Sequence, residues 1–233
     1  MIPTIQFTPH ERLAQAIQME TLEQATKLFR ANGCLLLENV FPQALITELY
    51  AAYFTRYHRY FRADKYPDAL TVGDKRYQVT VDFEPPFNTP LLYAHPLMLS
   101  IFRSLLGEDC VLGSFASVAS LPGSSVQHVH RDGVALFPNV PGKMIPSYAI
   151  TLVIPLVALN DLHGTTRIWP GTHRQDGEVS PNSDCVEPRV PLGSCFLMDY
   201  RVQHQGTENY SMQVRPLLYL VYHHYLRQLQ QYD

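Results

Sequence analysis

The chain has 233 residues, of which 46% are hydrophobic and 17% charged, and its formal net charge is −3. This length accommodates one large domain or two small ones, and the lack of a basic excess argues against nucleic acid as a partner. No apolar run approaches the ~20 residues that a membrane span needs, and the opening MIPTIQFTPHERL lacks the apolar segment of a secretion signal.

The four cysteines are Cys34, Cys110, Cys185 and Cys195, and none of them forms a CxxC pair. Scattered thiols of this kind are typical of reduced side chains in a reducing compartment. We therefore expect a single domain over residues 1–233 that is located in the cytoplasm as a monomer or homodimer. The expected partner is a small-molecule substrate, not nucleic acid or a membrane.

The first half of the chain predicts three helices and one buried strand. Apolar residues recur at helical spacing in residues 21–32, and a glycine follows them. The run CLLLENV (34–40) is typical of a buried strand. A second helix is expected from Pro42 to about Tyr60, because proline suits the first turn of a helix, and a third is expected over residues 95–107.

The second half is richer in strand signals. Four β-branched and aromatic runs are separated by proline and glycine turns: CVLGSFASVASLPG, SYAITLVIPLVALN, CFLMDY and RPLLYLVYHHYL. Residues 61–92 mix loops with one expected strand at 77–83. Helices followed by strands predict an α+β, mainly β fold with N-terminal helices flanking a double-sheet core. The segment 133–147 is a long predicted loop, of the kind that often covers a pocket.

The stretch QHVHRDG (127–133) has polar residues at alternate positions. Alternate side chains of an extended strand share one face, so His128, His130 and Asp132 are able to point the same way. Ten histidines and eleven aspartates in this chain make a chance His-x-Asp common. A solvated strand explains the stretch equally well, so the motif needs support from elsewhere.

Support comes from a histidine and an arginine near the end of the chain. His204 precedes Arg215 by eleven residues. Iron(II) sites that activate oxygen use two histidines and one carboxylate and leave three positions open, and His130, Asp132 and His204 supply that set. Two open positions suit a chelating keto acid and the third suits dioxygen. An arginine gives a two-point contact to the far carboxylate of such a co-substrate.

The segments QHVHRD, GTTRIWPGTH and HQGTEN, followed by an arginine, resemble the phytanoyl-CoA dioxygenase family of iron(II)- and 2-oxoglutarate-dependent oxygenases. The likeness covers roughly residues 20–226, and the specific motifs lie within 127–215. The resemblance implies a double-stranded β-helix, which is a jelly-roll, cupin-like core. It also implies a reaction that requires Fe(II), 2-oxoglutarate and O2.

The resemblance further implies a role for several residues. Three of them would hold the iron and one the far carboxylate of 2-oxoglutarate: His130, Asp132 and His204 for the metal, and Arg215 for the carboxylate. Gln127 matches a glutamine that lies near the co-substrate. Tyr148 and Thr151, which open the strand after the long loop, are further candidates for the co-substrate pocket.

Four residues are candidates for substrate contact by residue type alone: His128, Arg76, Arg167 and Trp169. Each has a structural alternative, namely a polar strand residue for the histidine, a surface cation for the arginines and core packing for the tryptophan. His173, in the turn WPGTHR, is expected to make a structural hydrogen bond. His223 and His224 are adjacent, so they face opposite ways on a strand and at most one faces the cavity.

We predict oxidation of a small polar metabolite in a biosynthetic tailoring step, by hydroxylation or by desaturation or oxidative C–N cleavage. Related halogenases carry a small residue in place of the carboxylate, so Asp132 favours these oxidations. Two alternatives stay open. One is a cupin-type metal enzyme that uses His128, His130 and His204 without a keto acid, and the other is a non-catalytic β-sandwich that binds a ligand without metal.

Overall fold

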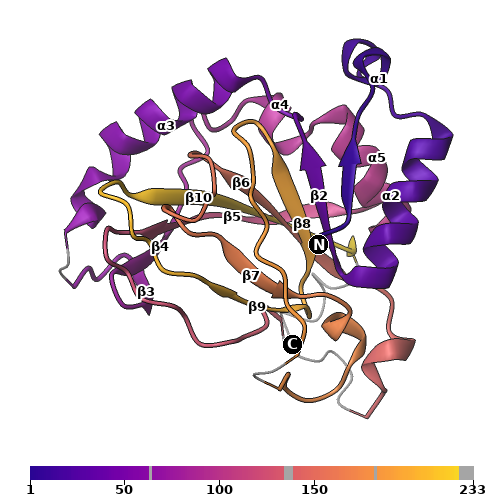
Figure 1. Ribbon diagram of the computed structural model, residues 1–233. Helices are drawn as coiled ribbons and strands as arrows, with labels where there is room; N and C mark the ends of the chain where they lie inside the picture. Colours follow the sequence, from indigo (N-terminus) through magenta and orange to yellow (C-terminus); the bar gives the residue numbers. More distant parts are fainter. Residues whose placement is uncertain (63–64, 134–138, 181–182, 226–233) are drawn as a thin grey trace.

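The computed structural model describes residues 1–62, 65–133, 139–180 and 183–225, and within them the fold is mainly β. A large mixed sheet contains, in spatial order, β1 (Thr4–Gln6), β2 (Cys34–Glu38), β8 (Cys195–Asp199), β6 (Ala149–Pro155), β10 (Arg215–His223), β5 (Val111–Ser120), β4 (Arg76–Thr80) and β3 (Leu70–Gly73). A small antiparallel sheet pairs β7 (Thr166–Trp169) with β9 (Gln203–Gly206). The two sheets form the double-sheet core predicted above (Figure 1).

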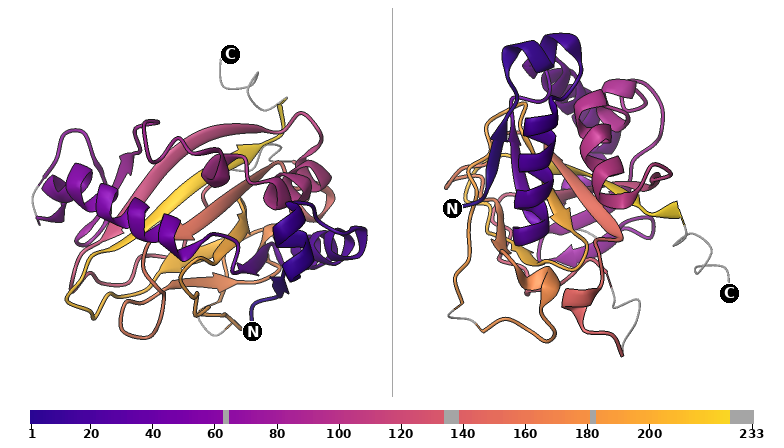
Figure 2. Two further views of the ribbon diagram at one scale, coloured as in Figure 1. Left: turned by 90° about the horizontal axis from the view of Figure 1, so that it is seen from above. Right: turned by 90° about the vertical axis from the view of Figure 1, so that its right-hand side faces the viewer.

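Helices cover the outer face of the large sheet. They are α1 (Pro9–Ala14), α2 (Met19–Asn32), α3 (Gln43–Tyr57), α4 (Pro90–Tyr93) and α5 (Pro96–Leu106). Three short 3-10 turns are η1 (His58–Phe61) after α3, and η2 (Gly142–Met144) and η3 (Thr172–Arg174), which contact each other near the end of β7. The small sheet lies on the other side of the large one (Figure 2). None of the helices in the described residues is long and apolar enough to cross a membrane.

Strand β6 shows how the two faces of the large sheet differ. Ile150, Leu152 and Ile154 belong to the main hydrophobic cluster, which also contains helix residues such as Phe29 and Phe102. The alternate residue Val153 belongs to a second cluster, which includes residues of the small sheet. Because side chains alternate along a strand, the odd-numbered residues of β6 face the space between the sheets. The functional site is built on that inner face.

Two predicted elements are found with small differences in their bounds. The helix expected from Pro42 to about Tyr60 ends at Tyr57 and continues as the 3-10 turn η1. The strand expected at 77–83 spans 76–80 as β4. Strands β1 and β3 were not expected, since the first has only three residues and the second is largely exposed.

The long loop expected at 133–147 is described in part. Residues 134–138 lie outside the described residues, and residues 142–144 form the turn η2. The C-terminal part of the segment is attached to the turn after β8, because the Arg201 guanidinium donates to the carbonyls of Gly142 and Ile145 at 3.3 and 2.9 Å. Ser147 donates to Asp199, the ion-pair partner of Arg201.

Candidate metal centre

The two histidines of the predicted site meet across a short backbone bridge. The amide of His130 donates to the carbonyl of His204 at 3.0 Å, and the amide of His204 donates to the carbonyl of His130 at 2.9 Å. This pairing extends the small sheet beside β9 and brings the imidazole centroids within 4.4 Å of each other. Asp132 follows two residues after His130, in a bend directly after the bridged segment.

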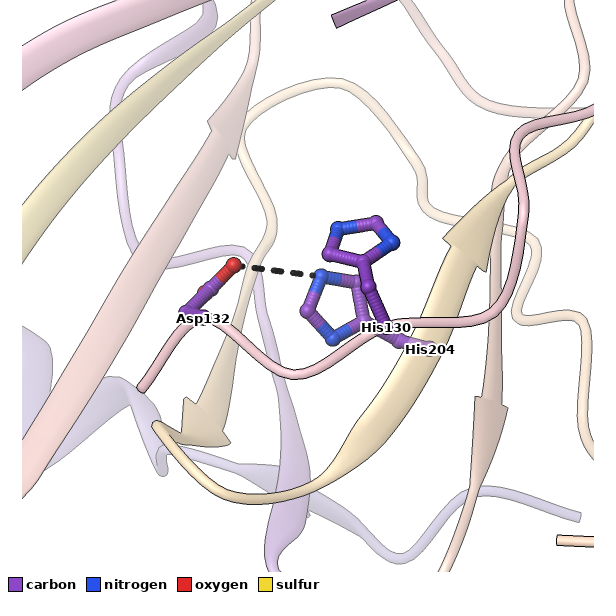
Figure 3. A group of neighbouring side chains, drawn as sticks. All are labelled: His130, Asp132 and His204. Atoms are coloured by element: carbon purple, nitrogen blue, oxygen red, sulfur yellow. Dashed lines mark ion pairs between the residues drawn. The ribbon is translucent and has the colours of Figure 1, made fainter. Parts of the chain in front are cut away.

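The ligand atoms of His130, Asp132 and His204 all lie within 4.8 Å of one another (Figure 3). The closest pair is His204 Nε2 and Asp132 Oδ1 at 3.5 Å. His128 is not part of this group; its side chain is exposed and its ring centroid is 5.3 Å from that of His130. The observed set is therefore two histidines and one carboxylate, not the three histidines of the cupin-type alternative.

Hydrogen bonds on the far side of each group fix the atoms that face one another. Nδ1 of His130 donates to the carbonyl of His128 at 3.0 Å, and Nδ1 of His204 donates to the carbonyl of Val202 at 3.1 Å. Thr151 Oγ1 donates to Asp132 Oδ2 at 3.1 Å. Two Nε2 atoms and Oδ1 are thus left facing one point, which is how surrounding bonds orient the ligands of a metal site.

Burial and the neighbouring His204 imidazole lower the pKa of His130. A lowered pKa favours the neutral imidazole, whose Nε2 carries the lone pair that a cation needs. The donor set suits a divalent transition metal: imidazole and carboxylate together bind iron, zinc and related ions.

A cavity of about 220 Å³ opens beside these three residues. The other lining residues are neutral: Val72, Gln78, Ser114, Ala116, Val118, Gln127, Thr151, Tyr200, Tyr219 and Val221. Most of them come from inward-facing positions of β4, β5, β6 and β10. Asp132 is accordingly the one acidic side chain in the described lining.

Two buried arginines form the next row on the same face of the large sheet. Arg215 of β10 and Arg76 of β4 both lie opposite Ser120 of β5. Each is 1% exposed. They lie outside the cavity lining, one row beyond Gln78 and Val118.

Neutral oxygens surround both guanidiniums. Arg215 donates to the carbonyls of His163 and Glu208 at 2.8 and 3.4 Å and to Ser120 Oγ at 3.1 Å. Both arginines donate to the carbonyl of Thr207, Arg215 at 3.0 Å and Arg76 at 2.9 Å. The two positive charges therefore share one acceptor.

Neither arginine has a neutralising partner in the described part of the chain. No carboxylate there lies within 4 Å of Arg76 or Arg215, and the buried Nε of each lacks a hydrogen-bond partner. Burial lowers the pKa of Arg76 to about 10; burial and the charge of Arg76 lower that of Arg215 to about 9. An unpaired buried charge is costly, so this pair is suited to an anion.

The remaining predicted residues are placed as follows. Gln127 lines the cavity, while its amide donates to the carbonyl of Val72 at 2.6 Å and accepts from the amide of Gly206 at 2.9 Å. Tyr148 is buried outside the lining, with the Arg201 guanidinium 5.3 Å from its ring centroid.

Arg167 and Trp169 lie on β7 opposite Gln205 and Gln203. That face is the one turned away from His204, which pairs with Ile168, and neither residue lines the cavity. Arg167 forms an ion pair with Glu187 at 2.5 Å.

The two other histidine regions have structural contacts. His173 is buried, its Nε2 donates to the carbonyl of Arg30 at 3.2 Å, and its ring occupies the space where a Cβ of Gly33 would stand. Gly33 has φ +69° at the end of α2, so both the backbone and the ring require glycine there. His223 continues the inward face of β10 and covers Gly113.

Tyr200 and Tyr219 are the two aromatic residues among the cavity residues that the sequence argument missed. Tyr200, in the turn after β8, lies beside Gly133, and Tyr219 lies on β10. Tyr219 sits in the apolar run LLYLVY, which is typical of a buried strand, and Tyr200 sits in the polar stretch DYRVQH, where His204 was the only residue singled out. A strand register would have revealed Tyr219, since it shares a face with Arg215.

Comparison with known proteins adds an independent observation. The family model "Phytanoyl-CoA dioxygenase (PhyH)" matches residues 29–217. Dioxygenase aneA of Aspergillus aculeatus is 31% identical over 138 residues, covering 55% of this chain and 46% of its own. Dioxygenase peniF of Penicillium patulum is 27% identical over 151 residues, covering 55% of this chain and 49% of the peniF chain. The match thus spans about half the length of these curated relatives.

Solved structures share the fold at low sequence identity. The non-haem α-ketoglutarate-dependent carbocyclase SnoK from nogalamycin biosynthesis has a TM-score of 0.69 at 21% identity, covering 91% of this chain and 85% of its own. HygX from Streptomyces hygroscopicus was solved with nickel and 2-oxoglutarate bound. It has a TM-score of 0.65 at 12% identity, and the match covers 90% of this chain and 88% of the HygX chain. The predicted double-stranded β-helix with flanking helices is confirmed.

Proposed function

Since the chain belongs to the phytanoyl-CoA dioxygenase family, we propose that it is a non-haem iron(II)- and 2-oxoglutarate-dependent dioxygenase that oxidises a small metabolite. The observation that carries the proposal is the convergence of His130, Asp132 and His204 within 4.8 Å, beside a cavity and a pair of unneutralised arginines. The single domain over residues 1–233 is part of the same proposal.

The donor set fits iron. Nε2 of His130, Nε2 of His204 and Oδ1 of Asp132 would hold the metal, because their other polar atoms are already used by carbonyls and by Thr151. Two histidines and one carboxylate on one face leave positions open, as oxygen-activating iron(II) sites require.

The arginine pair fits a dicarboxylate co-substrate. The far carboxylate of 2-oxoglutarate would neutralise Arg215 and Arg76, both of which are buried with an unpaired Nε. Bidentate contact to a carboxylate is the geometry that guanidinium favours. Arg76, first considered as a substrate contact, is thereby proposed as a second co-substrate residue beside Arg215.

When bound, iron and 2-oxoglutarate supply the oxidising power, through oxidative decarboxylation of the keto acid to succinate and carbon dioxide. The side chains of the protein orient the ligands, hold the co-substrate and limit the access of water. Thr151 holds the carboxylate of Asp132, and the Gln127 side chain connects the carbonyl of Val72 in β3 to the backbone amide of Gly206. Asp132, retained where a halogenase has a small residue, supports oxidation of a C–H bond.

The cavity supports a small substrate without a strong charge. Apart from Asp132 and the two histidines, its described lining is neutral, with hydroxyl and amide groups among valine and alanine. Such a surface recognises an uncharged polar molecule by a few hydrogen bonds and apolar contact. A biosynthetic tailoring role is supported by structures such as SnoK, which comes from nogalamycin biosynthesis.

The test is formation of succinate from 2-oxoglutarate by the iron-loaded protein under oxygen. We expect Asp132→Ala to abolish the activity, because one of three ligands is lost. The matched control is Asp161→Ala, which removes a surface carboxylate that is 80% exposed and paired with Arg189. Wild-type succinate formation by Asp132→Ala would refute the assignment.

Dependence on 2-oxoglutarate distinguishes the proposed oxygenase from the cupin-type alternative. A cupin-type enzyme would turn over without 2-oxoglutarate and would be insensitive to Arg215→Leu. The proposed oxygenase requires both 2-oxoglutarate and Arg215. A non-catalytic β-sandwich would hold iron no better than background after anaerobic purification.

A further inference from the structure

A second cavity lies outside the metal centre, between the end of α2 and the turns η2 and η3. Its volume is about 480 Å³, and its described lining has no carboxylate but four residues with a permanent positive charge: Arg30, Lys143, Arg174 and Arg201. A further cavity of about 460 Å³ adjoins it, since Arg30 and Arg174 line both. The further cavity adds Lys27 and one acidic residue, Glu23. We call the two cavities together the basic groove.

Most of the positive charge in the basic groove is not neutralised by the protein. Within the described ranges, the side chains of Lys27, Lys143 and Arg174 have no hydrogen bond and no carboxylate within 4 Å. The Arg30 side chain donates to the carbonyl of Ser104 at 3.1 Å. The whole chain has a net charge of −3, so the groove differs in sign from the protein around it.

Two buried side chains fix the elements that carry these cations. His173 lines the groove, and its Nε2 donates to the carbonyl of Arg30 at 3.2 Å, which holds η3 against α2. Arg201 donates to the carbonyls of Gly142 and Ile145, which holds η2 against the turn after β8. A ligand of the groove therefore does not have to order the backbone that binds it, which favours affinity.

Arg201 itself offers a hydrogen bond more than a charge. Its Nε and Nη2 donate to the carboxylate of Asp199 at 3.0 and 3.1 Å, and its Nη1 donates to the two carbonyls of the η2 segment. A guanidinium has five N–H groups, so one N–H of Nη2 has no acceptor among the described residues. Asp199 neutralises the charge, and the free N–H is available to a ligand.

Stabilisation of α2 explains only part of this cluster. Arg30 lies in the last turn of the helix, where the helix dipole favours a cation. Lys143 and Arg174 belong to η2 and η3, so the dipole of α2 gives no reason for them. Cations from three separate elements that line one cavity repel each other in the free protein, and this arrangement is typical of a site for an anion.

The composition of the groove favours a diphosphate attached to an apolar group. A diphosphate carries several negative charges, and arginine contacts phosphate oxygens in a bidentate manner. Four further residues of the lining bring apolar surface: Leu105, Met144, Ile145 and Pro146. The larger cavity lies in the volume range of small-molecule sites and has room for both parts of such a ligand.

We propose that the basic groove binds an organic diphosphate, with Arg30, Lys143 and Arg174 neutralising its charge and Arg201 donating a hydrogen bond to it. The groove and the metal cavity share no residue in their described linings. The inference therefore goes beyond the proposed function and does not depend on it.

The test is isothermal titration calorimetry of the full chain with inorganic pyrophosphate and with isopentenyl diphosphate, at physiological ionic strength. No metal is added, because diphosphates bind divalent cations. We expect both probes to bind the wild type, and isopentenyl diphosphate to bind more tightly through the apolar lining. In Arg174→Gln and in Lys143→Gln the Kd of both probes should rise about ten-fold, as for a lost hydrogen bond to a charged group. Both side chains are exposed, so these substitutions leave the core intact.

Two controls remove a cation elsewhere. Arg12→Gln removes an exposed charge from α1, and Arg215→Leu removes a buried charge beside the metal cavity. Both should leave the Kd of each probe within about two-fold, the scatter ordinarily allowed for an independent site.

Four results would overturn the proposal. The first is a wild-type protein that binds neither probe at millimolar concentration, and the second is an unchanged Kd in both Arg174→Gln and Lys143→Gln. The third is an equal loss in Arg12→Gln or Arg215→Leu, which would mean unspecific binding or binding at the arginine pair. The fourth is tighter binding of pyrophosphate than of isopentenyl diphosphate, which would exclude the organic ligand.

Discussion

Thr151 Oγ1 donates a hydrogen bond to Oδ2 of Asp132 at 3.1 Å, so a central strand of the large sheet holds a carboxylate that comes from an irregular segment. Thr151 is fully buried on β6, whereas Asp132 lies in a bend after the extended segment that pairs with β9. The two carboxylate oxygens of Asp132 therefore have different contacts. Oδ2 is used for orientation and Oδ1 faces the histidines.

Thr151→Val should therefore weaken metal binding without removing a metal ligand. Valine keeps the shape but not the hydroxyl, so Asp132 loses the group that fixes its rotation. Loss of an orienting hydrogen bond around a metal ligand costs about ten-fold to a hundred-fold in affinity. Anaerobic titration of the protein with iron(II) or manganese(II) measures the change.

The control for this substitution is Thr151→Ser, which retains the hydroxyl and should bind metal within a few-fold of the wild type. Equal metal affinities for the valine variant and the wild type would show that Asp132 is held by other groups.

Only part of the candidate metal site is encoded locally. His130 and Asp132 are separated by one residue, so an expected extended backbone brought them together, whereas His204 is distant in the sequence and was joined to them by the family resemblance. Helix α2 and strand β2 were also predicted with nearly correct bounds, because their apolar patterns and the following glycine depend only on neighbouring residues.

The arginine pair is different, because it depends on strand order. Arg76 and Arg215 meet only because β5 lies between β4 and β10 and presents Ser120 to both. No local pattern encodes that order. Similarly, Arg167 and Trp169 were selected by residue type, and only the pairing of β7 with β9 places them on the face opposite His204.

Gly206→Ala should impair the co-substrate site through steric conflict alone. Gly206 is not among the glycines with positive φ, so its backbone tolerates alanine. An added Cβ would overlap Nη1 of Arg76 and Oε1 of Gln127. We expect the KM for 2-oxoglutarate to rise by an order of magnitude, with a stability loss of about 1–3 kcal/mol from overpacking.

The matched control for Gly206→Ala is Gly142→Ala. A Cβ at Gly142 would meet the side chain of Asp176 at 3.2 Å, which is able to move aside, and Gly142 lies away from the arginine pair. Steady-state kinetics and urea unfolding of both variants separate the two effects. A normal KM in Gly206→Ala would mean that Arg76 is not used for the co-substrate.

Binding of 2-oxoglutarate should stabilise the metal-loaded fold. A ligand that binds only the folded state adds about 2.7 kcal/mol at a hundred times its Kd. The gain should disappear in Arg215→Leu even at the same ligand concentration, because the far carboxylate then loses its main cation. Unfolding midpoints of manganese(II)-loaded protein with and without 2-oxoglutarate test this, and an undiminished gain in the variant would contradict it.

His95 should make the fold sensitive to mild acid. Its side chain is 3% exposed, its ring is edge-on to Phe41, and its Nδ1 has no hydrogen-bond partner. Burial lowers the pKa of His95, while a hydrogen bond to the carbonyl of Val40 partly opposes the shift. In the unfolded chain the pKa of histidine is about 6.5.

The sign of the effect follows from these two pKa values. As the pH falls through about 6.5, the unfolded state takes up a proton before the folded state does, so the free energy of unfolding decreases until the folded pKa is reached. His95→Gln keeps an N–H donor for the Val40 carbonyl but does not titrate. Between pH 7 and pH 5 the wild type should therefore lose more stability than His95→Gln in urea unfolding. His173, whose pKa burial also lowers, is present in both proteins and cancels in the comparison; parallel pH dependences would show that His95 is protonated equally in both states.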